Sequence, residues 1–157
     1  MLKQFFLLTL LLSTTVLSVA NNAVDSNATQ EVKKKKTLSG KKLVVFVSNG
    51  DLQVAGMGFG IALSAAKQGA DVTIVVGANA VKYALKEGEQ NVYFAKGRTA
   101  RALLQDAVKS GAVIQMCSAN TDEMNLDEDD FIDGVKMVIS TEIFSKVFEE
   151  GSRIISF

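Results

Sequence analysis

Short runs of apolar, mostly β-branched residues alternate with helix-like segments over residues 41–157. Such continuous apolar runs are typical of strands that are buried on both faces of a parallel sheet. They predict five strands, at 43–47, 72–76, 112–116, 135–139 and 153–157. The segments between them predict helices at 53–68, 99–110 and 141–150, with a short helix from Asn79 to Lys86 and another through Phe131, which Asn125 and Glu128 would cap as a pair. This alternation predicts an α/β protein, a three-layer α/β/α fold with a five-stranded, mainly parallel sheet.

Two of the predicted helices differ in how their apolar side chains are distributed. Between Leu52 and Gln68, apolar side chains cover most of the helix circumference. A helix that is apolar all round is buried on all sides, so we expect either homo-oligomerisation through this helix or its burial under the 88–98 segment. In the last helix, one side is apolar and is expected to face inward; it carries Ile143, Phe144, Val147 and Phe148.

The first 20 residues have the layout of a secretory signal peptide. Lys3 supplies one positive charge, residues 5–12 are almost purely apolar, and Ser18 and Ala20 are the small residues that a cleavage site needs. The alternative is an uncleaved membrane anchor, but the apolar run is shorter than the roughly 20 residues of a spanning helix. We expect cleavage after Ala20 and a secreted or periplasmic protein, in an oxidising compartment.

Residues 21–40 are polar and predict a disordered linker between the signal peptide and the 41–157 domain. The linker contains Lys33 to Lys36, a run of four lysines. Such a run is either part of a solvated tether or a contact for anionic lipid or acidic partners. Membrane contact is therefore expected only through an uncleaved signal peptide or through these lysines.

The composition excludes several classes of site. The chain has 17 Lys+Arg, 17 Asp+Glu, no His and one Cys. Without His there is no Ser-His-Asp or Cys-His pair and no imidazole metal ligand. A single Cys excludes an internal disulfide and a Cys-rich zinc site. The balanced charge argues against a nucleic-acid partner, because proteins that bind nucleic acids usually have a basic excess.

Two motifs suggest a cofactor or a metal, and neither fits. Gly56, Gly58 and Gly60 have the spacing GxGxG rather than GxGxxG and lie within helical sequence, so we attribute them to close packing. The acidic run 127–130 lacks the ligand and glycine spacing of an EF-hand, and acidic residues in a first helical turn complement the helix dipole. No phosphate-binding GxxxxGK[ST] loop occurs. We therefore expect neither a metal nor a cofactor.

The candidate chemistry lies at one edge of the predicted sheet. Parallel sheets bind ligands beyond the carboxyl ends of their strands, where Cys117 ends the third strand and the polar loop 118–125 follows. Backbone N–H groups around Ser118 to Asn120 would stabilise a thiolate without His, while Asn49 and Asp51 would line the same cleft. A lone thiolate can hold a sulfane sulfur as a persulfide. The alternative is that Cys117 is a small buried core residue.

Five stretches of the sequence, in their order and spacing, resemble the DsrE/DsrF-like sulfur-relay family. They are residues 42–51, 62–74, 111–117, 134–139 and 148–157. The resemblance implies a small α/β fold that assembles as trimers or hexamers. It also implies a strand-end cysteine that accepts sulfur and passes it on, a role that falls on Cys117, and a partner protein that donates or accepts the sulfur.

The function expected from the sequence is that of an exported sulfur carrier, or of a subunit in a sulfurtransferase-type relay, that uses a persulfide on Cys117. The alternative is a non-catalytic, oligomeric binding or assembly protein in which Cys117 is buried and structural. A flavin or nucleotide binder of the flavodoxin type is less favoured, because the sequence shows no loop that would cradle a phosphate.

Overall fold

The computed structural model describes residues 37–88, 92–93 and 97–157. The predicted signal peptide (1–20) and most of the predicted linker (21–40), including its lysine run, lie outside these residues. The end of that linker is part of the fold: residues 37–40 form a turn, Leu38 packs against the core, and Thr37 Oγ1 donates a hydrogen bond to Gln68 Oε1 at 2.9 Å. The folded domain therefore includes residues 37–40, which the sequence assigned to the linker.

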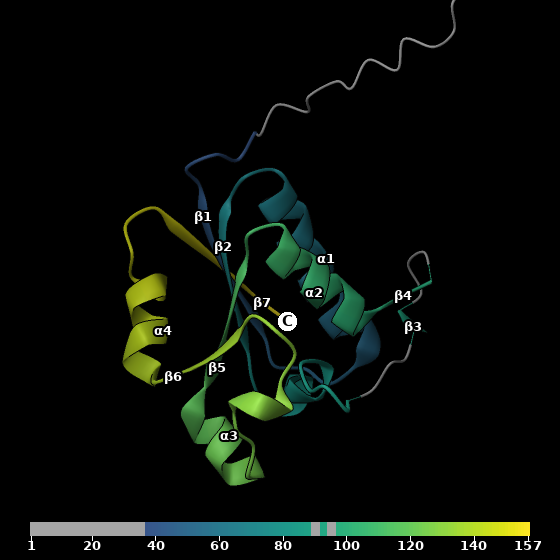
Figure 1. Cartoon of the computed structure of the whole chain (residues 1–157). Coiled ribbons are helices and arrows are strands. Elements are labelled where there is room, and N and C mark those ends of the chain that lie inside the picture. The colour runs from purple at the N-terminus through teal and green to yellow at the C-terminus, as the bar shows by residue number, and fades with distance from the viewer. Residues whose placement is uncertain (1–36, 89–91, 94–96) are drawn as a thin grey trace, which may run out of the picture. The chain divides into compact units, whose positions relative to one another are not determined.

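Five strands form the central sheet, in the order β6-β5-β2-β1-β7 (Figure 1). Each neighbouring pair is parallel, so the carboxyl ends of these strands share one edge. The five predicted strands are thus confirmed, and this sheet is parallel throughout. The strands are β1 (Lys42–Val47), β2 (Asp71–Val76), β5 (Val113–Cys117), β6 (Val135–Val138) and β7 (Ser152–Ser156).

Helices cover both faces of the sheet, which confirms the predicted three-layer fold. The helices α1 (Leu52–Lys67) and α2 (Ala100–Lys109) lie together on one face, and α4 (Ser140–Val147) lies on the other (Figure 1). In the described part of the chain, no helix has the length and apolar character needed to span a bilayer. The shorter elements are η1 (Ala78–Tyr83), α3 (Ser118–Met124), η2 (Glu128–Asp130) and the antiparallel pair β3 (Val92–Tyr93) and β4 (Arg98–Thr99).

The alternation of side chains along each strand produces two hydrophobic cores. Val45, Ile74 and Ile114, all fully buried, belong to the larger core that α1 and α2 cover. The intervening positions point to the α4 face, where a smaller core contains Val44, Val75, Val138 and Ile143. Cys117 packs against this smaller core, so the alternation of side chains along β5 places its thiol on the α4 side of the sheet.

The segment after Cys117 differs from the prediction. Residues 118–125 were expected to form a polar loop, but Ser118–Met124 form the helix α3, and Asn125 ends it in the left-handed conformation with φ 53°. Ser, Asn, Thr and Asp favour turns when their side chains bond the nearby backbone. Here Thr121 is fully buried, and its hydroxyl donates to the Ser118 carbonyl at 2.9 Å, which is compatible with a helical turn.

Two further expectations at helices are wrong. The short helix that ends before Phe131 is capped by Asp127 and Asp130 rather than by Asn125, because these two acids form reciprocal hydrogen bonds with each other's backbone. In α4, Ile143 faces the sheet as expected, but Phe144 is 54% exposed and Phe148 is 83% exposed. α4 has only eight residues, and among the described elements it is the only helix on its face of the sheet (Figure 1), so Phe144 and Phe148 lack a cover from a neighbouring helix.

The apolar helix α1 is largely buried by its own domain. Gly58 lies against the sheet: a Cβ at this position would approach Val47 Cγ2 at 2.8 Å and Phe157 Cδ2 at 3.0 Å. Close packing therefore explains this glycine, as predicted from the sequence. A Cβ at Gly60 would contact nothing, and the exposed apolar side chains of α1 are Met57 and Ile61.

Candidate functional site

Cys117 is the last residue of β5, at the carboxyl edge of the sheet. It is aligned with Val138 of the neighbouring strand β6, and α3 begins immediately after it. The residue is half-buried and its thiol forms no disulfide. The prediction placed Cys117 at a strand end on this edge, and the structure confirms that position.

A cavity of about 310 Å³ opens beside Cys117, between the ends of β1, β2 and β5 and the first turns of α4. We call it the Cys117 cavity. Most of its wall is apolar and consists of Phe46, Val47, Val75, Val76, Gly77, Ala78, Ile143 and Phe144. Its polar residues, apart from Cys117, are Ser48, Asn120 and Ser140. The cysteine therefore borders a space large enough for a small molecule.

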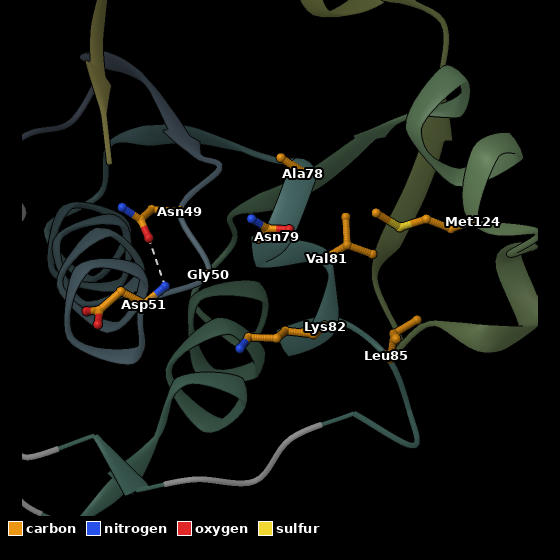
Figure 2. Close-up of a pocket in the computed structure, with 9 residues that line it drawn as sticks. All are labelled: Asn49, Gly50, Asp51, Ala78, Asn79, Val81, Lys82, Leu85 and Met124. Carbon is orange, nitrogen blue, oxygen red and sulfur yellow. Dashed lines mark hydrogen bonds between the residues drawn. The ribbon is translucent and has the colours of Figure 1, made fainter.

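Asn49 and Asp51 lie in a different pocket. This second pocket, of about 490 Å³, is also lined by Asn79, Lys82 and Met124 (Figure 2). Neither Asn49 nor Asp51 lines the Cys117 cavity, so the expectation that they share its cleft is wrong in its geometry. The reason is the route of the chain: after β1 it enters α1, which packs on the face of the sheet opposite to α4.

The polar groups of that second pocket stabilise the local fold. Asp51 is the N-cap of α1, and its carboxylate accepts hydrogen bonds from the backbone N–H groups of Gln53 and Val54 at 2.9 and 3.0 Å. The Asn49 side-chain oxygen accepts from Asp51 N at 2.8 Å (Figure 2). Tyr83 Oη donates to the Gly50 carbonyl at 2.8 Å and ties η1 to this turn.

Ala78 lines both pockets. Its φ is 45°, in the left-handed region that an L-residue adopts at a cost of about 1–2 kcal/mol. Backbone strain of this kind often occurs at functional sites. The turn after β2 is therefore held in an unfavourable conformation at the place where it lines the Cys117 cavity.

The other two predicted site residues are near Cys117 but differ in their positions. Asn120 lines the Cys117 cavity, one helical turn after the cysteine. Ser118 is half-buried and does not line the cavity, and its carbonyl accepts the Thr121 hydroxyl. The structure thus brings Cys117 and Asn120 to one cavity and leaves Ser118 beside it.

Sequence reasoning missed three residues near the thiol. Phe46 and Phe144 place aromatic rings in the cavity wall, from β1 and α4. Gln115 precedes Cys117 on the same face of β5 and is only 8% exposed. Its Oε1 accepts no hydrogen bond from the described residues. The signal that could have found Gln115 is one polar residue in the otherwise apolar run 112–116.

The pKa values of two charged groups, Arg101 and Glu149, are shifted from their ordinary values. Burial lowers the pKa of Arg101, against a smaller opposite effect of Glu87, and Arg101 Nη1 donates to the Lys86 carbonyl at 2.7 Å. Hydrogen bonds from Lys42 and Lys146 lower the pKa of Glu149. Within the ranges that the structure describes, no group of three or more acidic or cysteine side chains is placed to hold a metal ion.

The geometry defines a class of protein: a parallel three-layer α/β domain with one free cysteine at the carboxyl end of an inner strand, beside a cavity. The model of the DsrE/DsrF-like family matches residues 41–157, and the chain belongs to that family. This confirms the resemblance inferred from the sequence and relates the chain to a family associated with sulfur relay. No curated protein matches the chain at a significant level.

Two solved structures show the same fold. The YchN protein from E. coli matches with a TM-score of 0.63 at 16% identity, over 74% of this chain and 99% of its own. MTH1491, a protein of unknown function from Methanobacterium thermoautotrophicum, matches with a TM-score of 0.60 at 16% identity, also over 74% of this chain and 99% of its own. At this identity the similarity establishes the fold alone.

Proposed function

We propose that this protein carries sulfur as a persulfide on Cys117, as a carrier or as a subunit of a sulfurtransferase-type relay. The observation that supports this most is the position of the chain's single thiol, half-buried at a strand end and beside a cavity. A thiol that borders a cavity can meet a small sulfur donor, whereas a thiol sealed in the core cannot. The family to which the chain belongs is consistent with this chemistry.

The proposed reaction needs one cysteine and no other oxidant. The Cys117 thiolate attacks the outer sulfur of a donor R–S–S⁻, the new Sγ–S bond forms, and the electron pair of the broken S–S bond leaves with R–S⁻. In delivery, a thiolate of an acceptor attacks the outer sulfur and Cys117 leaves as the thiolate. The donor or the acceptor is a partner protein in this proposal.

Asn120 and the backbone around it are proposed to assist this step. The side chain of Asn120 borders the same cavity as the thiol, and an amide N–H is a good donor to a sulfur anion. Backbone N–H groups from Ser118 to Asn120 would add to this stabilisation of the anionic sulfur.

The experiment is sulfur loading followed by intact-mass measurement. The protein is incubated with polysulfide and, in a separate sample, with thiosulfate. We expect polysulfide to add the mass of sulfur that dithiothreitol removes, whatever the extent of the reaction with thiosulfate. Cys117→Ser is the control, because it keeps the size of the side chain and removes the nucleophile. No added sulfur, or an adduct that persists in Cys117→Ser, would contradict the proposal.

The second candidate is a non-catalytic binding or assembly protein. One observation favours it: Cys117 contacts the smaller core, as a structural cysteine would. Thiol labelling of the native protein separates the two candidates. Labelling of Cys117 at a rate similar to that of the unfolded chain favours the carrier, and labelling only after denaturation favours the assembly protein.

We further propose that copies of the chain assemble, as trimers or hexamers. Exposed apolar side chains support this, with Met57 and Ile61 on α1 and Phe148 and Ile154 on the α4 face. Sedimentation would measure the assembly in the wild type, in Met57→Ser and in Phe148→Ser. A wild-type monomer at micromolar concentration would exclude assembly, and the variant that dissociates would identify the helix involved.

Export is also part of the proposal, on the basis of the sequence of residues 1–20. A bacterial host that expresses the full chain would place the mature protein in the periplasmic fraction, with a mass that corresponds to a chain beginning at Asn21. Full-length protein in the cytosolic fraction would contradict export, and full-length protein in the membrane fraction would support the uncleaved anchor instead.

A further inference from the structure

The Cys117 cavity has an uncharged wall. Among the described residues that line it, none is Asp, Glu, Lys or Arg, and eight of the twelve are apolar. Two aromatic residues, Phe46 and Phe144, line the cavity together with Cys117. This composition determines which sulfur compounds can enter the cavity beside Cys117 at a low free-energy cost of desolvation.

A small dianion such as thiosulfate gains little in such a cavity. Moving charge out of water costs several kcal/mol unless a counter-charge or several hydrogen bonds replace the lost hydration. The polar side chains that the wall offers are the hydroxyls of Ser48 and Ser140 and the amide of Asn120, all neutral. A donor with one apolar end would instead place that end against the hydrophobic wall and keep its charge toward the opening.

The cavity is large enough for an aromatic ring. Its volume is about 310 Å³, and an engineered apolar cavity of about 150 Å³ already binds benzene. Phe144 belongs to the cavity wall but is 54% exposed, so its ring forms part of the mouth of the cavity. An aryl or branched alkyl group that enters beside this ring would bury apolar surface from both partners.

We propose that the Cys117 cavity selects sulfane-sulfur donors that carry a bulky apolar group, that is, aryl or branched alkyl persulfides and thiosulfonates, over small donors such as methanethiosulfonate and inorganic thiosulfate. This inference rests on the proposed sulfur-carrier function and specifies the donor for the same site. The apolar group occupies the space between Phe46, Phe144 and Ile143, and the outer sulfur of the donor lies next to the cysteine.

The reaction is balanced with these donors alone. With benzenethiosulfonate, the Cys117 thiolate attacks the outer sulfur, the Sγ–S bond forms, the S–S bond of the donor breaks, and its electron pair leaves with benzenesulfinate. The cysteine sulfur is oxidised to the persulfide level while the sulfonyl sulfur is reduced to the sulfinate. With an organic persulfide R–S–SH the leaving group is R–S⁻, and the products are the Cys117 persulfide and a thiolate.

The test compares two donors that differ only in the apolar group. Benzenethiosulfonate and methanethiosulfonate have the same charge and the same reacting atoms, so the second is the matched control for the first. The rate of persulfide formation on the full chain is measured by intact mass for both donors and for thiosulfate. Each rate is divided by the rate with a small free thiol, which removes differences in intrinsic reactivity.

We expect the normalised rate for benzenethiosulfonate to exceed that for methanethiosulfonate by about tenfold, since even one methylene group in an apolar pocket is worth tenfold or more. The preference should fall to a few-fold or less in Phe144→Ala, which removes the ring at the mouth. Ile154→Ala is the control variant, because Ile154 is similarly exposed on the α4 face but does not line the cavity. This variant should keep the preference.

The outcomes separate this inference from the function on which it rests. Persulfide formation with equal normalised rates for the two thiosulfonates, or a preference that Phe144→Ala leaves intact, overturns the donor selectivity alone. Absence of persulfide from all three donors overturns the carrier function and the selectivity together. An aryl preference that is lost in Phe144→Ala and kept in Ile154→Ala supports both.

Discussion

Gln115 and Cys117 lie on the same face of β5, the face that α4 covers. Gln115 is aligned with Val75 of β2, which belongs to the smaller core against which Cys117 packs. The side chain of Gln115 is nine-tenths buried, and its Oε1 receives no hydrogen bond from the residues that the structure describes. A buried carbonyl oxygen without a donor lowers the free energy of unfolding, so the Gln115 side chain destabilises the fold two residues before Cys117.

The first prediction concerns this oxygen. Gln115→Met keeps an unbranched side chain of similar size and removes the acceptor, and we expect the free energy of unfolding to rise by about 1 kcal/mol. Chemical denaturation with urea measures this change. A loss of stability would show instead that the oxygen has a donor in solution, from water or from a second copy of the chain.

The second prediction separates Asp51 from the chemistry of Cys117. Because the Asp51 carboxylate caps α1, Asp51→Ala should lower the free energy of unfolding by about 1 kcal/mol, and Asp51→Ser should restore most of it. Neither variant should change the rate of sulfur loading on Cys117, because Asp51 lines the other pocket. A loading rate that falls in both variants would mean that the two pockets are coupled.

Much of the fold follows from the sequence because buried parallel strands have a strong local signal. The run 43–47 and the run 72–76 are continuous and β-branched, and both form inner strands. The position of Cys117 at the carboxyl edge follows from the same pattern. These features depend on the apolar content of short segments, which can be read directly from the residues.

The rest depends on which face of the sheet each loop approaches, and the local sequence does not specify this. Asn49 follows β1 and Cys117 ends β5, and the two strands run parallel. Yet the chain after Asn49 enters a helix on one face of the sheet, while Cys117 packs on the other face. Likewise, Phe144 and Phe148 are exposed because, among the described elements, no second helix lies beside α4 on its face of the sheet. Both outcomes are determined by elements that are neighbours in space but distant in the sequence.

The third prediction uses two glycines of α1 as a matched pair. A Cβ at position 58 would approach Val47 and Phe157 too closely, so Gly58→Ala should cost about 1–3 kcal/mol of stability through overpacking. A Cβ at position 60 would meet nothing, so Gly60→Ala should gain about 0.5–1 kcal/mol through better helix propensity. Thermal unfolding of both variants tests whether Gly60→Ala is more stable than Gly58→Ala. A Gly58→Ala variant that is as stable as Gly60→Ala would contradict the close contact.

The fourth prediction concerns acid stability and Glu149. This carboxylate accepts hydrogen bonds from Lys42 Nζ at 2.9 Å and Lys146 Nζ at 3.4 Å, which lower its pKa. A carboxyl whose pKa is lower in the folded state adds stability above its unfolded pKa, and this contribution is lost as the pH falls through the folded pKa. Glu149→Gln should therefore lower the melting temperature slightly at neutral pH and not at about pH 2.

The control for this prediction is Glu150→Gln. Glu150 is the exposed neighbour of Glu149, and only its backbone carbonyl accepts a hydrogen bond from Lys42. The melting temperature of this variant should follow the wild type at both pH values. Equal effects of the two substitutions would indicate a general charge effect and not the specific contacts of Glu149.

The strand order has a consequence for when the sheet can be completed during synthesis of the chain. The inner strand β1 pairs on one side with β7, and the backbone carbonyl of Phe157 accepts hydrogen bonds from Ser48 and Asn49. Contacts such as that between Lys42 and Glu150 join residues 108 positions apart. Synthesis must therefore proceed through β7 before β1 gains its second neighbour, and contacts of such long sequence separation form slowly. For the export that we propose, this delay lengthens the time during which the sheet is incomplete, and an incompletely folded chain passes a secretion channel more readily than a folded one.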